Sequence, residues 1–72
     1  MSLSAVKAGR KVRILKVAGE EGTKKRLNTL GFVAGIVITV VHVSTGNMIV
    51  AIHDSRIAIN SEVSDNVLVE EV

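Results

Sequence analysis

The sequence predicts an all-β domain, a small five-stranded barrel or curled sheet with one short α-helix inserted after the first strand. The chain has 72 residues and no linker-like stretch, so it forms one small domain. Its apolar fraction is 47%, carried mostly by Val, Ile, Leu and Ala, which favours strands. The apolar segments are short and are joined by turn residues, as in barrels that bury their edges by closing.

The first strand is predicted at residues 11–17, where Val12 and Ile14 alternate with Lys and Arg and point inward. The alternation breaks over residues 15–17, which indicates a bulge or a bend. A loop, Gly19 to Gly22, follows the strand.

A helix of about two turns is predicted from Thr23 to Leu30, because this stretch consists of strong helix formers. Thr23 is placed to cap its N-terminus, and Leu27 and Leu30 lie on one face. Gly31 then serves as the C-cap glycine, and Phe32 is expected to fold back onto the helix.

Four further strands are predicted from β-branched residues and turn signals, at 36–43, 48–53, 56–59 and 66–70. The loop Ser44 to Asn47 makes a hairpin of the first two. Asp54-Ser55 forms the next tight turn. Asn60 or Ser61 caps a brief helical turn that runs through Ser64.

The apolar faces of these elements give the candidate core. Val and Ile alone can fill a barrel of this size. Hairpin edges in so small a chain can also pair between subunits, which leaves a homo-oligomer open. The core candidates are Ile14, Leu27, Leu30, Ile36, Ile38, Val40, Val50, Ile52, Ile57, Ile59, Val67 and Val69.

Charge is distributed unevenly along the chain. The net charge is +2, but eight of the nine basic residues precede residue 27, against two acids there, Glu20 and Glu21. Such a basic half can attract RNA, acidic lipid or an acidic protein surface. The alternative is that these residues are solvated positions that alternate with the apolar residues of the first strand.

Neither a disulfide framework nor a targeting segment is visible. Cys is absent, which fits a reducing cytoplasm. The longest apolar run, 36–43, is far shorter than the roughly 20 residues of a membrane span, and no apolar h-region begins the chain. We therefore expect a cytoplasmic protein without direct membrane insertion. Residues 1–4 are expected to be a disordered N-terminus or foreign to the domain, which then covers 5–72.

The stretch GEEGTKKRLNTLGFVAG, residues 19–35, allows three interpretations: a phosphate loop, the GxxG clamp of a KH domain, or a structural corner that contains a helix. A Walker phosphate loop needs a wider glycine spacing, and Glu20 and Glu21 would repel a polyphosphate. The KH clamp joins two helices, whereas this loop follows a strand pattern and carries acids. The structural corner is favoured.

This corner, Arg26-Leu27-x-x-Leu30-Gly31-x-x-x-Gly35, lies between a basic strand and a hairpin and resembles the signature of the FeoA family, the small accessory protein of bacterial ferrous iron transport. The chain departs from the family at Ala34, where proline is usual, and at Asp54-Ser55, where a turn glycine is usual. The resemblance spans about residues 5–70 and continues through Gly46, 48–50, 56–59, Val63 and 67–69.

The resemblance implies an SH3-like barrel that works as a protein-binding module. Its implied partner is a FeoB-like membrane transporter, contacted at the cytoplasmic GTPase domain. The barrel is also similar to the C-terminal domain of DtxR-type metal-dependent repressors, which leaves a stand-alone metal-responsive regulator open. The main alternative is a small nucleic-acid-binding barrel that uses the basic strand and helix, although a single Phe offers no stacking platform.

The candidate partner-binding residues lie on the helix corner, where Lys and Arg surround a Leu and a Phe that a small core need not bury completely. The alternatives are that Leu27 is purely core and that the lysines only provide solubility. Gly31 and Gly35 are interpreted as structural turn residues. The candidates are Lys24, Lys25, Arg26, Leu27 and Phe32.

Catalysis is not indicated by any motif. His42 and His53 are the only imidazoles, and in the predicted hairpin residue 42 pairs with 49 and residue 53 with 38. They would lie roughly 13 Å apart and could not share a metal ion. No spacing marks a nucleophile elbow or a triad. We expect no catalytic residue, no metal site and no cofactor, with His53-Asp54 at most an adventitious ion site.

Overall fold

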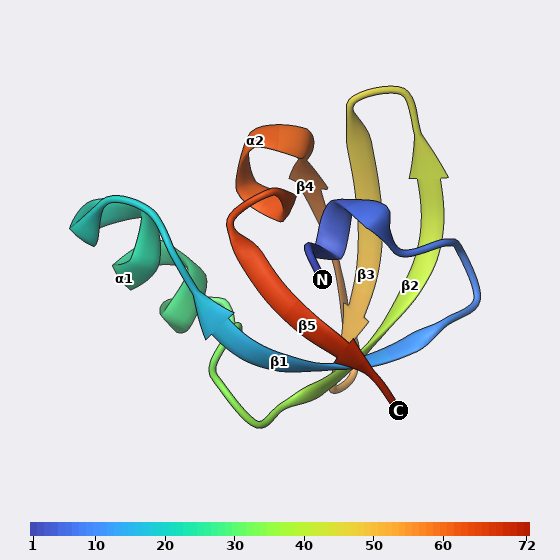
Figure 1. Cartoon of the computed structure of the whole chain (residues 1–72), viewed down its shortest axis with the longest axis horizontal. Helices are drawn as coiled ribbons and strands as arrows, with labels where there is room; N and C mark the ends of the chain where they lie inside the picture. Colours follow the sequence, from blue (N-terminus) through green and yellow to red (C-terminus); the bar gives the residue numbers. More distant parts are fainter.

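The computed structural model describes residues 1–72 and confirms the predicted fold class (Figure 1). Five antiparallel strands form one curled sheet in the order β4-β3-β2-β1-β5. Helix α1 (Glu21–Thr29) follows the first strand, and α2 (Ser61–Ser64) connects the last two. None of the helices has the length and apolar composition of a membrane span. The strands are β1 (Lys11–Val17), β2 (Val37–Ser44), β3 (Asn47–Ile52), β4 (Ser55–Asn60) and β5 (Val67–Glu71).

Strand β1 has the predicted inward face and the predicted bulge. Val12 and Ile14 are completely buried. The pairing of β1 with β5 shifts register between Ile14 and Lys16, so Leu15 is the extra residue and lies on the outer surface. A bulge increases the local twist of a sheet, which helps a single sheet to curl around a core.

Both hairpin loops contain two residues. The β2–β3 hairpin closes at the pair Ser44 and Asn47, so its loop is shorter than the predicted four residues, and Gly46 has φ +76°. The β3–β4 hairpin turns one residue earlier than predicted, and His53 in this turn has φ +54°. These turns require a positive φ, which is unusual for a residue with a side chain, and glycine is therefore common in them.

The hairpin register follows the prediction only near the loop. His42 pairs with Ile49, as predicted. A bulge between Val40 and His42 then shifts the remaining pairs by one residue. The predicted pairing of residue 53 with residue 38 is therefore wrong. A run of β-branched residues contains no sequence signal for a bulge inside the strand, so the register shift could not be predicted.

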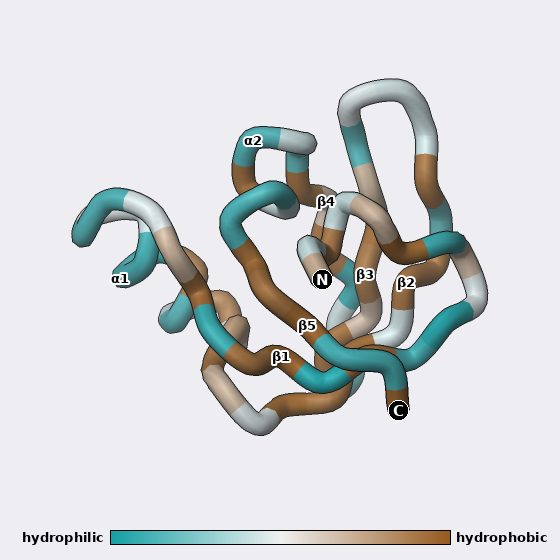
Figure 2. The backbone as a smooth tube through the Cα atoms, in the orientation of Figure 1, coloured by the Kyte–Doolittle hydropathy of each residue, from teal (hydrophilic) through white to brown (hydrophobic).

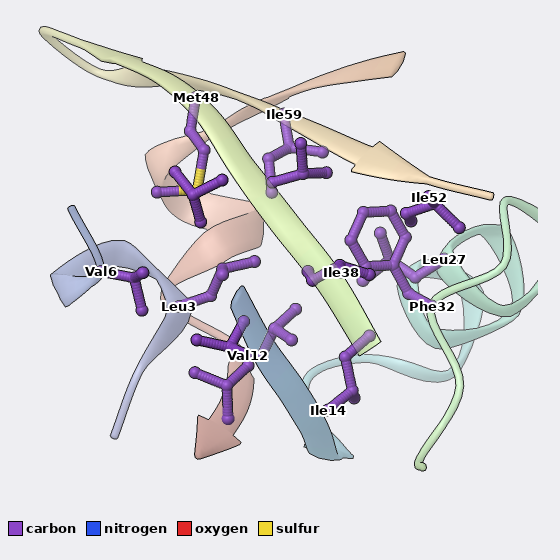
Figure 3. Packing of buried hydrophobic residues seen from close by; sticks show 14 residues of the cluster. Leu3, Val6, Val12, Ile14, Leu27, Phe32, Ile38, Met48, Ile52 and Ile59 are labelled. Carbon is purple, nitrogen blue, oxygen red and sulfur yellow. The ribbon is translucent and has the colours of Figure 1, made fainter. Parts of the chain in front are cut away.

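One cluster of 14 buried apolar side chains fills the curled sheet (Figure 3). The strands carry the hydrophobic stretches of the chain, whereas α1 is largely hydrophilic (Figure 2). The predicted core is confirmed for the inward strand positions and for Leu27, but it is wrong for Leu30, which is exposed. Ile36 and Ile57 are only partly buried. The prediction missed Leu3, Val6, Phe32 and Met48.

Residues 1–4 are part of the barrel, so the expectation of a detached N-terminus is wrong. Leu3, in the short 3₁₀ helix η1 (Leu3–Ala5), is completely buried. Ser2 forms a β-bridge with Leu68. The Met1 ammonium group donates a hydrogen bond to the Val69 carbonyl at 3.0 Å, and the Val69 N–H donates to the Met1 carbonyl at 2.8 Å. The N-terminus thereby covers the outer edge of β5.

Helix α2 is capped as predicted. The Asn60 side-chain oxygen accepts a hydrogen bond from the Val63 N–H at 2.9 Å, which satisfies a free donor of the first turn. Val63 packs against the core from this turn. The cap therefore fixes α2 beside the end of β4.

Candidate functional site

Helix α1 begins two residues earlier than predicted. Glu20 occupies the N-cap position without a side-chain hydrogen bond, so the prediction of Thr23 as the cap is wrong. Glu20 and Glu21 instead place negative charge at the helix N-terminus, where the helix dipole favours it. The loop before α1 joins a strand to a helix, which differs from the helix-to-helix setting of a KH clamp.

The end of α1 is fixed to the barrel by a Schellman motif. Gly31, with φ +104°, donates a backbone hydrogen bond to the Asn28 carbonyl at 3.1 Å. The Phe32 N–H donates to the Leu27 carbonyl at 2.9 Å. This turn brings the Phe32 ring against Leu27 inside the core (Figure 3). A Cβ atom at position 31 would lie 3.2 Å from Ile52 Cγ2, so glycine also allows the turn to approach β3 closely.

A groove lies between α1 on one side and β4 with α2 on the other, and we call it the α1–β4 groove. It encloses about 540 Å³. Leu27 and Ile59 are buried and form its apolar floor, whereas Leu30 is 45% exposed and offers an accessible apolar contact. The lining residues are Gly19, Glu20, Thr23, Arg26, Leu27, Leu30, Ala58, Ile59, Asn60, Glu62, Val63 and Asn66.

The five predicted partner-binding residues do not form one surface. Arg26 and Leu27 line the α1–β4 groove, whereas Lys24 and Lys25 border a shallower depression formed with β1 and the loop after α1. Leu27 and Phe32 are 3% and 0% exposed, so the expectation that the core would not bury both is wrong, and the alternative of a core position holds for Leu27. The Schellman turn directs Phe32 inward, and α1 packs on the barrel through Leu27.

Charged side chains of both signs line the groove without pairing to each other. The two ion pairs of the molecule join Arg13 to Glu70 and Lys24 to Glu21. The charged groove residues Arg26, Glu20 and Glu62 therefore have no ion-pair partner within the chain. These charges are free to pair with a partner.

Strand β4 contributes a free edge to the groove. It is the last strand of the sheet and pairs only with β3. The two-residue turn makes Ile52 and Ser55 a hydrogen-bonded pair, and such pairs alternate along the ladder. The backbone N–H and C=O groups of Arg56, Ala58 and Asn60 consequently point away from β3. Ala58 lines the groove and presents an unpaired N–H and C=O there, whereas Asn60 adds only its N–H, because its carbonyl accepts the first hydrogen bond of α2.

The described side chains do not gather into a catalytic or metal-binding constellation. His42 lies on β2 and His53 in the β3–β4 turn, and both are exposed. No three His, Cys, Asp or Glu side chains come together. The groove offers apolar contact, backbone pairing and rim charges, which are features of binding.

Sequence reasoning missed the groove residues outside α1. The spacing of Leu27 and Leu30 put both on one helix face, which was the available signal for Leu30. Ala58, Asn60 and Glu62 reach the groove only because the curled sheet brings β4 and α2 opposite α1. No local pattern marks that proximity.

Comparison with known proteins agrees with this architecture. The chain matches the FeoA domain over residues 1–71. The crystal structure of an iron uptake regulatory protein (FeoA) has a TM-score of 0.90 and 25% identity, and the match covers 100% of this chain and 96% of that chain. No curated protein sequence matches.

Two further structures show how widely the fold is shared. The Stenotrophomonas maltophilia FeoA complexed with zinc, described as a prokaryotic SH3 domain protein and a candidate ferrous iron transport activating factor, has a TM-score of 0.85 and 22% identity, with 97% of this chain and 89% of that chain covered. A manganese-dependent transcriptional repressor has a TM-score of 0.92 and 15% identity, with 100% of this chain and 41% of the repressor covered.

The curled sheet and its inserted helix define this protein as an SH3-like barrel domain. The sequence match extends over nearly all of that barrel. The chain belongs to the FeoA domain family.

Proposed function

We propose that the chain is a non-enzymatic, cytoplasmic accessory protein of bacterial ferrous iron transport that docks on the GTPase domain of a FeoB-like transporter and modulates it. Membership of the FeoA family supports this proposal. The observation that carries it is the α1–β4 groove, in which the exposed Leu30 stands above a buried apolar floor and beside a free strand edge.

An extended segment of the transporter suits this groove. Its backbone can pair with the outward N–H and C=O of Ala58 and with the N–H of Asn60, as in recognition by strand addition, while an apolar side chain contacts Leu30. Arg26 and Glu62 provide charges of both signs that select the partner. Because α1 bounds the groove opposite β4, a single segment fits there better than the edge of another sheet. Docking that favours one nucleotide state of the GTPase domain shifts that domain toward this state.

Substitution of Leu30 by aspartate is expected to weaken binding to the isolated GTPase domain by at least about tenfold, because it places a charge at the apolar contact. Isothermal titration calorimetry measures the affinity, and circular dichroism checks the fold. Val43→Asp is the matched control, since Val43 and Leu30 are 43% and 45% exposed and Val43, on β2, is not among the residues that line the groove. Equal affinities of the two variants would remove the groove from the proposal.

The same titration at low and high salt separates this function from the nucleic-acid alternative. Docking centred on Leu30 should change little with salt, whereas RNA binding through phosphates falls steeply. Absence of GTPase-domain binding, together with salt-sensitive RNA binding, would replace the proposed function with the alternative.

A further inference from the structure

A second surface, which we call the outer face, consists of the solvent side of β1, β2 and β5 together with the α1–β2 loop. It carries four aliphatic side chains, Leu15, Val33, Val37 and Leu68, that are 49%, 38%, 43% and 40% exposed. Strand pairing places Val37 beside Arg13 and Leu68 beside Lys16 on this side of the sheet. Leu15 and Val33 border one shallow depression with Lys24 and Lys25.

The α1–β2 loop has an unusual composition for a surface loop. Residues 31–36, GFVAGI, contain no polar side chain, and Figure 2 shows no hydrophilic colour there. Phe32 is buried, but Val33, Ala34 and Gly35 are exposed. Two backbone hydrogen bonds hold the loop on β1: Gly35 N–H to the Ile14 carbonyl at 2.7 Å, and Ile14 N–H to the Ile36 carbonyl at 2.9 Å. An apolar tip is therefore held toward the outside.

Positive charge surrounds these aliphatic side chains. Two acidic residues near these side chains are already paired, Glu70 with Arg13 at 3.3 Å and Glu21 with Lys24 at 3.8 Å, and a third, Glu71, lies opposite the buried Val12 and thus on the other side of the sheet. The remaining lysines, Lys11, Lys16 and Lys25, have no acidic partner. The outer face is thus both apolar and cationic, opposite in charge to an anionic surface.

We propose that the outer face binds the surface of an anionic phospholipid bilayer, with the tip of the α1–β2 loop at headgroup level. A bilayer supplies both matching chemistries, since headgroup phosphates attract the lysines and acyl carbons accept the aliphatic side chains. Lysine stems can cover apolar surface while the ammonium groups reach the phosphates. Nucleic acid fits less well, because Phe32, the sole aromatic residue, is buried and cannot stack on bases.

Vesicle co-sedimentation tests this binding, with phosphatidylcholine alone and mixed with phosphatidylglycerol as probes. The chain is expected to sediment with the anionic vesicles only, and less at high salt. Lys25→Gln should weaken partitioning about fivefold, whereas Arg56→Gln on β4, with the same change in charge, should not. Val33→Ser should weaken it about threefold, and Val43→Ser should leave it unchanged.

Three results would overturn the lipid assignment. The first is no sedimentation with anionic vesicles at low salt, and the second is an equal loss in Lys25→Gln and Arg56→Gln. The third is that the chain does not sediment with vesicles but binds RNA, and that Lys25→Gln weakens this RNA binding. That result would assign the outer face to nucleic acid. Leu30→Asp should sediment like the unmodified chain, so the outcome does not depend on the proposed docking function. Circular dichroism establishes that each variant is folded.

Discussion

Replacement of Phe32 by alanine is expected to lower the free energy of unfolding by about 3 to 5 kcal/mol. The ring is completely buried, and Figure 3 shows it among Leu27, Ile38 and Ile52, where it joins α1 to the sheet. A domain of 72 residues has a total stability of roughly 4 to 11 kcal/mol, so the substitution removes a large part of it and would unfold a domain at the lower end of this range. Urea denaturation followed by far-UV circular dichroism measures the loss.

The neighbouring residue provides the control for this experiment. Val33 is exposed, and Val33→Ala should change the free energy of unfolding by no more than about 0.5 kcal/mol. Phe32→Leu keeps most of the buried volume and should cost less than Phe32→Ala. A wild-type urea midpoint for Phe32→Ala would contradict the position of the ring in the core.

Replacement of Leu3 by alanine is expected to lower the free energy of unfolding by about 2 to 5 kcal/mol. Leu3 is completely buried, and the segment that carries it is fixed by the bridge between Ser2 and Leu68 and by the bonds between Met1 and Val69. The loss would show in the same denaturation experiment. If the N-terminus lay outside the domain, Leu3→Ala would not lower the free energy of unfolding.

Leu15→Ala is the matched control for Leu3→Ala, because it removes the same atoms from an exposed position. Its effect should stay within about 0.5 kcal/mol. Similar small effects for both variants would show that the first residues contribute nothing to the barrel.

The β-structure was predictable because its signals are local. The alternation of Val12 and Ile14 with basic residues predicted the bounds of β1. The end of this alternation after Ile14 predicted the bulge in β1. Asn60 gave the cap of α2 for the same reason, since a cap is a relation between residues close in sequence.

The errors concern relations that extend across the fold. Leu3 is buried because the N-terminus pairs with β5 at the other end of the chain, and residues 1–5 contain no strand pattern that indicates this. The core buries both Leu27 and Phe32 and is larger than expected, because it also contains Leu3 and Val6 of the N-terminal segment. The predicted partner-binding residues are neighbours in sequence, but a helix turns Lys25 and Leu27 to different sides.

The α1–β4 groove exists because the two edge strands of the sheet, β5 and β4, are covered differently. The outer edge of β5 is covered by Met1 and Ser2, whereas the outer edge of β4 has no such cover. The Schellman motif then holds α1 opposite β4 through Phe32. An uncovered strand edge ordinarily invites unwanted pairing, and a helix beside it restricts access to a narrow segment.

The most direct test of the docking proposal is an NMR titration of the ¹⁵N-labelled chain with the unlabelled GTPase domain of a FeoB-like transporter. We expect the backbone amide signals of Thr23, Arg26, Leu30, Ala58 and Asn60 to shift or broaden first, because these residues line the α1–β4 groove. Unchanged signals for these five residues at saturation, with binding established by calorimetry, would contradict the proposal.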